Sequence, residues 1–228
     1  MISENLTFPH EGAAFEAALM RPDGPRRPVG VLVLHGGHGL DAHTLGQTER
    51  LARAGHVAMA PDLFGGPFRD RAHGMQVIGG LIGEPLRLRA RCAAALAVLQ
   101  TKVSKVAVVG YCFGGLAALE MARGGSALHC AVSLHGGLQA LIPDETSPIV
   151  TPLLFCVGAD DPFAPAAART TLEDELRRRG ADWTMLVLGG AQHGFTEVTA
   201  TPAAGIAYNR PADQRSWRAL LGMLDEDV

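Results

Sequence analysis

The chain has no closely spaced pair of cysteines. Its four thiols, Cys92, Cys112, Cys130 and Cys156, lie far apart, and no Cys-x-x-Cys motif occurs. A zinc knuckle and a dithiol redox centre both depend on such spacing. Both are therefore excluded, and each cysteine is treated as a separate thiol.

Long apolar runs and an excess of basic residues are also missing. Glycine, proline or charge interrupts each apolar stretch before the roughly 18 residues that a membrane span needs. Residues 1–8 lack the basic and apolar segments of a secretory signal. The formal charge is −3, and the basic residues are spread out or lie beside acids, which argues against a phosphate-binding surface. We therefore expect a cytoplasmic protein without membrane or nucleic-acid partners.

Short apolar runs alternate with segments of helical spacing along most of the chain. Runs rich in Val, Leu and Ile predict buried strands at 29–34, 57–60, 103–109, 131–134, 152–157 and 183–188. Helical spacing predicts helices at 44–54, 85–99, 114–123, 166–179 and 212–224. Residues 6–8 and 13–20 predict an antiparallel hairpin at the sheet edge. The pattern indicates one α/β domain over residues 1–228, a doubly wound, mostly parallel sheet with helices on both faces.

Residues 64–83 show neither pattern. They contain many glycines and the charges Arg69, Asp70 and Arg71. Loops of this length are usually functional or mobile. We therefore expect a long loop here, and closure over a functional site is one role for it.

The strongest local signal is the stretch 110–115, which reads Gly-Tyr-Cys-Phe-Gly-Gly between a predicted strand and a predicted helix. This is the form of a nucleophile elbow, in which glycines allow the strand to turn sharply into the helix. Cys112 would then stand at the carboxyl end of the sheet, where the helix N-terminus favours a thiolate. The alternative is that Cys112 is a small buried apolar residue, which is the preferred interpretation for the other three cysteines.

Two later turns supply the partners that a thiol nucleophile needs. Residues 158–163 read Gly-Ala-Asp-Asp-Pro-Phe after one predicted strand, and residues 189–195 read Gly-Gly-Ala-Gln-His-Gly-Phe after the next. The order nucleophile, acid, histidine is typical of the α/β-hydrolase fold. His193 is the candidate base and Asp161 the acid that orients it. Asp160 remains an alternative acid, because a cap or turn role suits either aspartate, and a purely structural role is the alternative for His193.

The turn 35–39, His-Gly-Gly-His-Gly, follows the first parallel strand. Its glycines expose backbone N–H groups, and we expect Gly37 to form an oxyanion hole with the Phe113 amide. The alternative is that these glycines only permit a tight turn. A metal site built from His35, His38, Asp41 and His43 is less favoured, because these residues have no helical His-x-x-x-His register. We expect neither a metal nor an organic cofactor.

Four segments together resemble the dienelactone hydrolase family, over nearly the whole chain: 51–65 with its Pro-Asp-Leu-Phe-Gly ending, the elbow, 158–163 and 192–195. The family pattern places the acid at Asp161. The resemblance implies hydrolysis of a small ester or lactone through an acyl-thioenzyme. We expect its substrate pocket to be lined by His35, Tyr111, His135 and Phe195, and a local cap or packing role is an equal alternative for His135.

The chain departs from the family pattern at two places. The best-known members carry a glutamate in the first oxyanion turn, where this chain has Gly36. They also hold a substrate carboxylate with arginines, one of them shortly after the histidine, where this chain has Thr196 and Glu197. An acid there would repel a carboxylate substrate, although Arg69 or Arg71 could supply an anion contact. A ligand-binding protein without turnover and an acyltransferase with the same nucleophile therefore remain open, as does a monomer or a homodimer.

Overall fold

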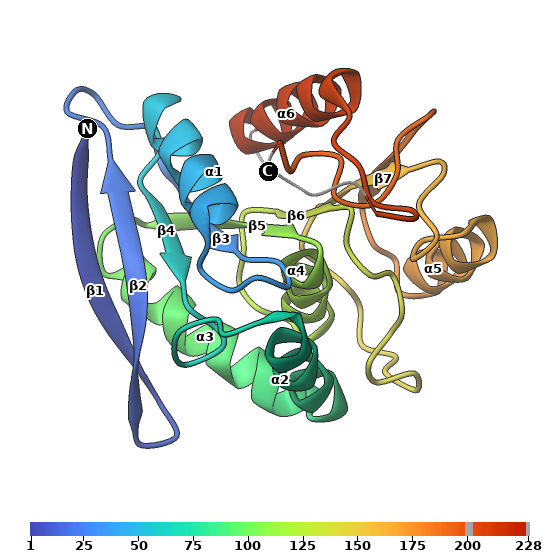
Figure 1. Ribbon diagram of the computed structural model, residues 1–228, viewed down its shortest axis with the longest axis horizontal. Coiled ribbons are helices and arrows are strands. Elements are labelled where there is room, and N and C mark those ends of the chain that lie inside the picture. Colours follow the sequence, from blue (N-terminus) through green and yellow to red (C-terminus); the bar gives the residue numbers. More distant parts are fainter. Residues whose placement is uncertain (199–202, 227–228) are drawn as a thin grey trace.

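The computed structural model describes residues 1–198 and 203–226 and contains an eight-stranded sheet of order β1-β2-β4-β3-β5-β6-β7-β8 (Figure 1). The strands are β1 Ile2–His10, β2 Ala13–Arg21, β3 Val29–Leu34, β4 Ala58–Pro61, β5 Lys105–Tyr111, β6 Ala131–Leu134, β7 Leu153–Gly158 and β8 Trp183–Leu188. The helices are α1 Ala42–Arg53, α2 Arg71–Gly83, α3 Pro85–Gln100, α4 Phe113–Arg123, α5 Ala166–Arg178 and α6 Arg210–Asp225.

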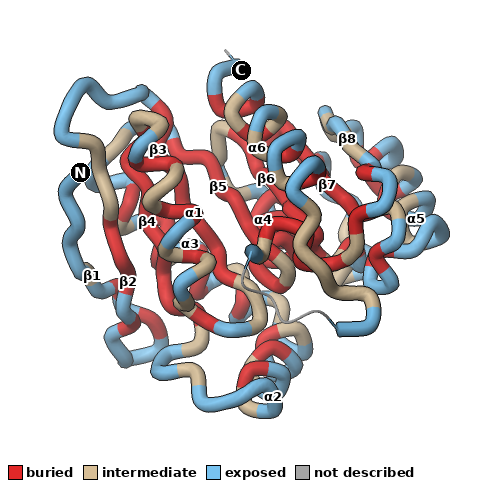
Figure 2. The backbone as a smooth tube through the Cα atoms, turned by 45° about the horizontal axis from the view of Figure 1, so that its top comes forward, coloured by how far each residue is buried: buried red, intermediate tan, exposed pale blue. Residues whose placement is uncertain are grey.

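The sheet confirms the predicted α/β-hydrolase architecture. Strands β4, β3, β5, β6, β7 and β8 are parallel, whereas β1 and β2 form an antiparallel hairpin that joins the edge through β2 and β4. Helices α1 and α6 cover one face, and α3, α4 and α5 cover the other (Figure 1). The central strands are buried on both sides (Figure 2), which explains why they read as continuous apolar runs.

The order of the strands places the functional turns side by side. The chain runs from β3 outward to β4 and then crosses back to β5, so β3 and β5 are neighbours at the point where the strand order reverses. Open α/β sheets bind ligands at this reversal, beside the carboxyl ends of the strands. The glycine turn after β3 and the elbow after β5 both lie there.

Two structural predictions were wrong. Residues 71–83 form the helix α2 and not a loop. Four glycines hide its helical pattern, while its start signal is Asp70, whose carboxylate accepts the His73 N–H at 2.8 Å. Strand β8 was expected to be buried, but it is the last strand of the sheet, and Val187 is 49% exposed.

The helix that begins at the elbow is anchored at its far end by buried ion pairs. Glu120 and Arg123 on α4 are 0% and 1% exposed. Arg123 binds Glu175 of α5 at 2.6 Å, and Arg89 of α3 binds Glu120 at 2.8 Å. Removing one partner of such a pair costs about 3–5 kcal/mol, because the other charge is left buried alone. These pairs therefore hold α4 rigidly in place beneath the elbow.

Candidate active site

The elbow has the strained geometry that a nucleophile turn requires. Cys112 lies between β5 and α4 with φ 53° and ψ −116°, in the left-handed region that non-glycine residues seldom adopt. A Cβ on Gly110 would lie 1.9 Å from the Gly114 oxygen, and one on Gly114 would lie 2.1 Å from the Leu34 oxygen. Only glycine fits at either position, which confirms the reason for these glycines in the sequence.

A chain of hydrogen bonds links Cys112 to the two residues predicted to act with it. His193 Nε2 lies 3.1 Å from Cys112 Sγ, and His193 Nδ1 lies 3.0 Å from Asp161 Oδ2. Asp161 is 2% exposed, and its other oxygen accepts the Phe163 N–H at 2.8 Å. Asp160, the alternative acid, is exposed. The structure therefore brings together Cys112, His193 and Asp161, which belong to three different turns.

The electrostatics of His193 differ from those of an isolated histidine. Burial alone would lower the pKa of His193, but its hydrogen bonds and charge interactions with Asp161 and Cys112 outweigh burial and raise it to about 10. The imidazolium form of His193 is therefore favoured at neutral pH. A thiolate, not a thiol, is the nucleophilic form of cysteine.

The other three cysteines have the opposite environment. Cys92, Cys130 and Cys156 are each 0% exposed, and burial raises the pKa of each thiol to about 12. Cys112 is partly exposed. Reagents for thiols should therefore modify Cys112 selectively in the folded protein.

Hydrogen bonds of the buried His35 ring hold the glycine turn after β3, residues 35–39, in place. The Leu63 N–H donates to His35 Nε2 at 2.9 Å, so the ring proton is on Nδ1, which donates to the Gly36 oxygen at 2.8 Å. This oxygen and the Gly37 N–H belong to the same trans peptide and point in opposite directions. Neither the Gly37 nor the Phe113 amide donates a hydrogen bond to another described residue, which leaves both free for an oxyanion.

The four residues expected to line the substrate pocket lie beneath the surface. His35, Tyr111, His135 and Phe195 are 0%, 1%, 0% and 0% exposed. Tyr111 donates to Gln47 of α1 at 3.4 Å, and Phe195 packs edge-on against His135 with ring centroids 5.0 Å apart. In this structure they support the site from behind and do not line it.

Two further residues lie at the site: Phe163, for which no role was predicted from the sequence, and Glu197, which was expected to repel a carboxylate substrate. Phe163 is 57% exposed, and its ring stands edge-on to His193 with centroids 4.8 Å apart. The only sequence signal was its place two residues after Asp161. Glu197 Oε1 lies 4.0 Å from the position that a Cβ on Gly36 would occupy, and that position is 3.3 Å from Cys112 Cβ. A carboxylate therefore stands over the turn that bears Gly36.

Three of the four residues considered as metal ligands have other hydrogen-bond partners. Both ring nitrogens of His35 bind backbone groups, Asp41 caps α1 through the Thr44 N–H, and His43 Nε2 lies 3.1 Å from Thr196 Oγ1. Over residues 1–198 and 203–226, the structure contains no cluster of three or more side chains suited to a metal. Within the same ranges, no helix is both long and apolar enough to cross a bilayer.

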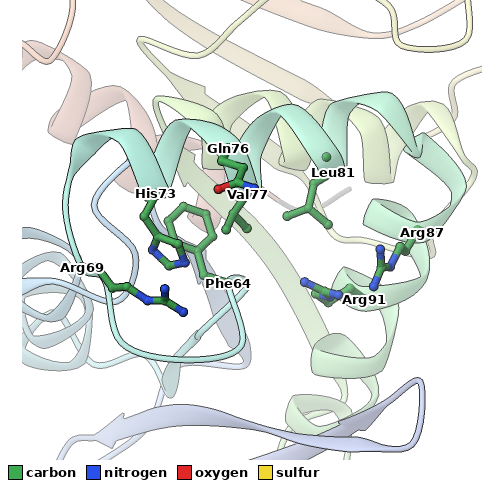
Figure 3. Close-up of a pocket in the computed structure, with 9 residues that line it drawn as sticks. Phe64, Arg69, His73, Gln76, Val77, Leu81, Arg87 and Arg91 are labelled. Carbon is green, nitrogen blue, oxygen red and sulfur yellow. The ribbon is translucent and has the colours of Figure 1, made fainter.

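A separate cavity of about 460 Å³ lies between α2 and α3 (Figure 3). It is lined by Phe64, Arg69, His73, Gln76, Val77, Gly80, Leu81, Arg87 and Arg91. Arg87 already binds Glu11, and Arg91 donates to the Leu63 oxygen at 2.7 Å. Phe64 separates this cavity from the elbow, since its ring packs against His35 and Phe113. Arg69 therefore faces this cavity and not Cys112.

The strained elbow, the following histidine and aspartate turns and the sheet order define an α/β-hydrolase. The model of the dienelactone hydrolase family matches residues 15–227. The carboxymethylenebutenolidase of a Pseudomonas species is 33% identical, with 98% of this chain and 97% of that protein covered.

Solved structures agree with the sequence comparison. The structure titled m3DLH has a TM-score of 0.90 and 32% identity, covering 98% of this chain and 97% of that one. A dienelactone hydrolase-like promiscuous phosphotriesterase from metagenomic libraries has a TM-score of 0.91 and 33% identity, with the same coverage. The chain belongs to the dienelactone hydrolase family and is a hydrolase of the ester and lactone class.

Proposed function

We propose that this protein hydrolyses small esters or lactones through an acyl-thioenzyme on Cys112. The observation that carries the proposal is the pair of distances at His193, 3.1 Å to Cys112 Sγ and 3.0 Å to Asp161 Oδ2. A nucleophile, a base and a residue that orients the base stand in one hydrogen-bonded chain. The partial exposure of Cys112 gives a carbonyl carbon a route to the sulfur.

The reaction has two halves, acylation of Cys112 and hydrolysis of the thioester, and His193 transfers a proton in each. The Cys112 thiolate attacks the carbonyl carbon, and the resulting oxyanion accepts hydrogen bonds from the Gly37 and Phe113 amides. The C–O bond to the leaving alkoxide then breaks, and the His193 imidazolium protonates that oxygen. In the second half, neutral His193 takes a proton from water, hydroxide attacks the thioester, and the C–S bond breaks to release a carboxylic acid and the thiolate.

Glu197 favours a neutral acyl group. Its Oε1 lies 4.0 Å from the position that a Cβ on Gly36 would occupy, in the turn next to Cys112. A carboxylate on the substrate would be repelled there. We therefore expect neutral esters and lactones to react faster than those that bear a carboxylate close to the carbonyl.

The test is turnover of p-nitrophenyl acetate and a panel of enol-lactones by Cys112→Ala. Activity should fall to background, whereas the matched variant Cys92→Ala, which removes a buried thiol, should keep it. Mass spectrometry of the wild-type protein quenched during turnover should find the acyl group on Cys112. Full activity in Cys112→Ala would refute the proposal.

Two other outcomes would replace it with a different function. Ligand-dependent thermal stabilisation without turnover of any compound would indicate a binding protein. Products esterified with an added alcohol or thiol would indicate acyl transfer from the same intermediate.

A further inference from the structure

On its buried side, the turn that bears His193 is held by the hydroxyl of Thr196, which contacts two histidine rings. Thr196 Oγ1 lies 2.8 Å from His135 Nε2 and 3.1 Å from His43 Nε2. Thr196 is 1% exposed and His135 is 0% exposed. The three residues come from separate parts of the fold: His135 follows β6, His43 lies in α1 and Thr196 lies in the turn after β8.

The positions of the protons follow from the partners of each atom. His135 Nδ1 is buried and has no partner within the described part of the chain. A buried N–H without an acceptor is rarer than an unpaired acceptor, which places the His135 proton on Nε2, where it donates to Thr196. The hydroxyl has one proton of its own, and His43 Nε2 is the acceptor that remains for it.

The contacts of Gln47 support the same direction of hydrogen bonding, in which Thr196 donates to His43. Gln47 Nε2 lies 3.4 Å from His43 Nε2, while Tyr111 donates its hydroxyl proton to Gln47 Oε1, also at 3.4 Å. In this orientation of the Gln47 amide, the nitrogen faces His43 and is a donor. His43 Nε2 is thus an acceptor, and the chain runs from His135 through Thr196 to His43.

This chain determines the orientation of the ring beside His193. The rings of His135 and His193 meet edge-on with centroids 5.3 Å apart. His135 has φ 40°, a backbone conformation that is costly for a non-glycine residue and that persists only where its surroundings hold it. Burial, and then the nearby His193 and His43, lower the pKa of His135 well below its usual range. The His135 ring is therefore uncharged and held in one orientation, and the His193 ring packs against it.

Backbone hydrogen bonds alone do not set this ring. The His193 N–H donates to the Gly205 oxygen at 3.0 Å, and the His193 oxygen accepts the Ala207 N–H at 3.1 Å. These bonds fix the main chain of His193, while its ring direction depends on Asp161 at one nitrogen and on the rings that pack beside it.

We propose that Thr196 is a positioning residue for the reaction proposed above, because its hydroxyl bridges the imidazoles of His135 and His43 and thereby holds the His135 ring against His193. His193 Nε2 is then kept at hydrogen-bond distance from Cys112 Sγ. Thr196 itself touches neither the sulfur nor the substrate.

The experiment compares Thr196→Val with Thr196→Ser in the full chain. Valine keeps the shape of threonine and loses both hydrogen bonds, whereas serine keeps the hydroxyl. For p-nitrophenyl acetate, kcat of Thr196→Val should fall by roughly 10–100-fold, the effect of a small misplacement of a reacting group, with KM within about twofold. Thr196→Ser should lie within about threefold of wild type.

Alkylation of Cys112 by iodoacetamide as a function of pH separates positioning from folding. A looser His193 stabilises the thiolate less, so the pH of half-maximal alkylation should rise in Thr196→Val and return in Thr196→Ser. The matched control is Thr151→Val. Thr151 is 2% exposed and bonds the Ser126 oxygen before β7, at the opposite edge of the sheet, so its kcat and alkylation profile should equal those of wild type.

Unchanged kcat and alkylation in Thr196→Val would overturn the proposal, and so would a serine variant no better than valine. If Thr196→Val does not fold, His43→Leu decides, because His43 is only partly buried. It removes the acceptor of the Thr196 proton and should lower kcat by roughly 3–10-fold. Absence of an acyl group on wild-type Cys112 would instead refute the proposed function, which the wild-type measurement reveals first.

Discussion

Replacing Asp161 with asparagine tests the orientation of His193 with almost no change in shape. Asp161 Oδ1 accepts the Phe163 N–H at 2.8 Å, and Oδ2 faces His193 Nδ1 at 3.0 Å. Asparagine has one oxygen, and the Phe163 amide requires it. The NH₂ group would then face His193 Nδ1, which places the histidine proton on Nε2, directed at Cys112. In that tautomer Nε2 cannot accept a proton from the sulfur.

The pKa of His193 gives the size of the effect. Burial lowers this pKa, yet the contacts with Asp161 and Cys112 raise it to about 10 from an ordinary 6.5. The difference corresponds to on the order of 5 kcal/mol in favour of the imidazolium. If Asp161 supplies about half, its loss removes roughly 2–3 kcal/mol, which slows the reaction by on the order of 10²-fold. The imidazolium should also be lost at lower pH, so the alkaline decline of kcat/KM should move toward neutrality.

The assay is kcat/KM for p-nitrophenyl acetate between pH 6 and 11, with the exposed neighbour Asp160→Asn as the matched control. Asp160→Asn should match wild type across the range. Activity of Asp161→Asn within threefold of wild type would refute the orienting role. An equal loss in both variants would assign the effect to the turn and not to the Asp161 carboxylate.

Three further outcomes follow from burial, charge and packing. Burial lowers the pKa of four histidines, His10, His35, His56 and His135. The unfolded chain binds their protons below about pH 6.5 while the folded chain does not, so stability should fall as pH drops below 6.5, by up to roughly 1.4 kcal/mol per histidine and pH unit. Urea unfolding at about pH 6.5, 5.5 and 5 measures this below the range in which the raised pKa of His193 acts in the opposite direction, and a flat profile contradicts it. Glu197→Gln should raise kcat/KM about fivefold for a carboxylate-bearing lactone, the effect of about 1 kcal/mol, and leave neutral esters unchanged; equal changes for both would exclude charge selection. Gly114→Ala should not fold, because its Cβ would lie 2.1 Å from the Leu34 oxygen. Gly46→Ala, in an open position on α1, should instead unfold at a slightly higher temperature than the wild type. Thermal unfolding followed by circular dichroism distinguishes the two variants, and a stable Gly114→Ala would show that the elbow can widen.

The parts of the site that the sequence predicted are those encoded by short local patterns. Cys112 stands between glycines at a strand-to-helix turn, and Asp161 and His193 each follow a predicted strand in the expected order. The carboxyl ends of parallel strands lie on one edge of a sheet, so sequence order was enough to bring these turns together. Helix α2 was missed because its four glycines remove the apolar stripe on which helix prediction depends.

Residues next to the predicted trio were harder to place. Tyr111 precedes Cys112 at the end of β5, and successive side chains of a strand point to opposite faces. Tyr111 therefore enters the core beneath α1, although Cys112 is partly exposed. His135 follows β6 and has a positive φ, which turns its ring inward to Thr196. Neither direction can be read from neighbours in sequence.

The contacts around His193 separate charged groups from neutral ones, and this separation has a chemical reason. On the side of the sulfur, His193 lies between Cys112 and Asp161, and its pKa, raised to about 10, favours the imidazolium. Behind it, the partners are a hydroxyl and a neutral imidazole, Thr196 and His135. A positive charge on His135 at a centroid distance of 5.3 Å would repel the imidazolium and weaken the pair with the thiolate. A neutral support fixes the His193 ring without placing a second positive charge beside the imidazolium, because the hydrogen bond between Thr196 and His135 is directional but joins uncharged groups.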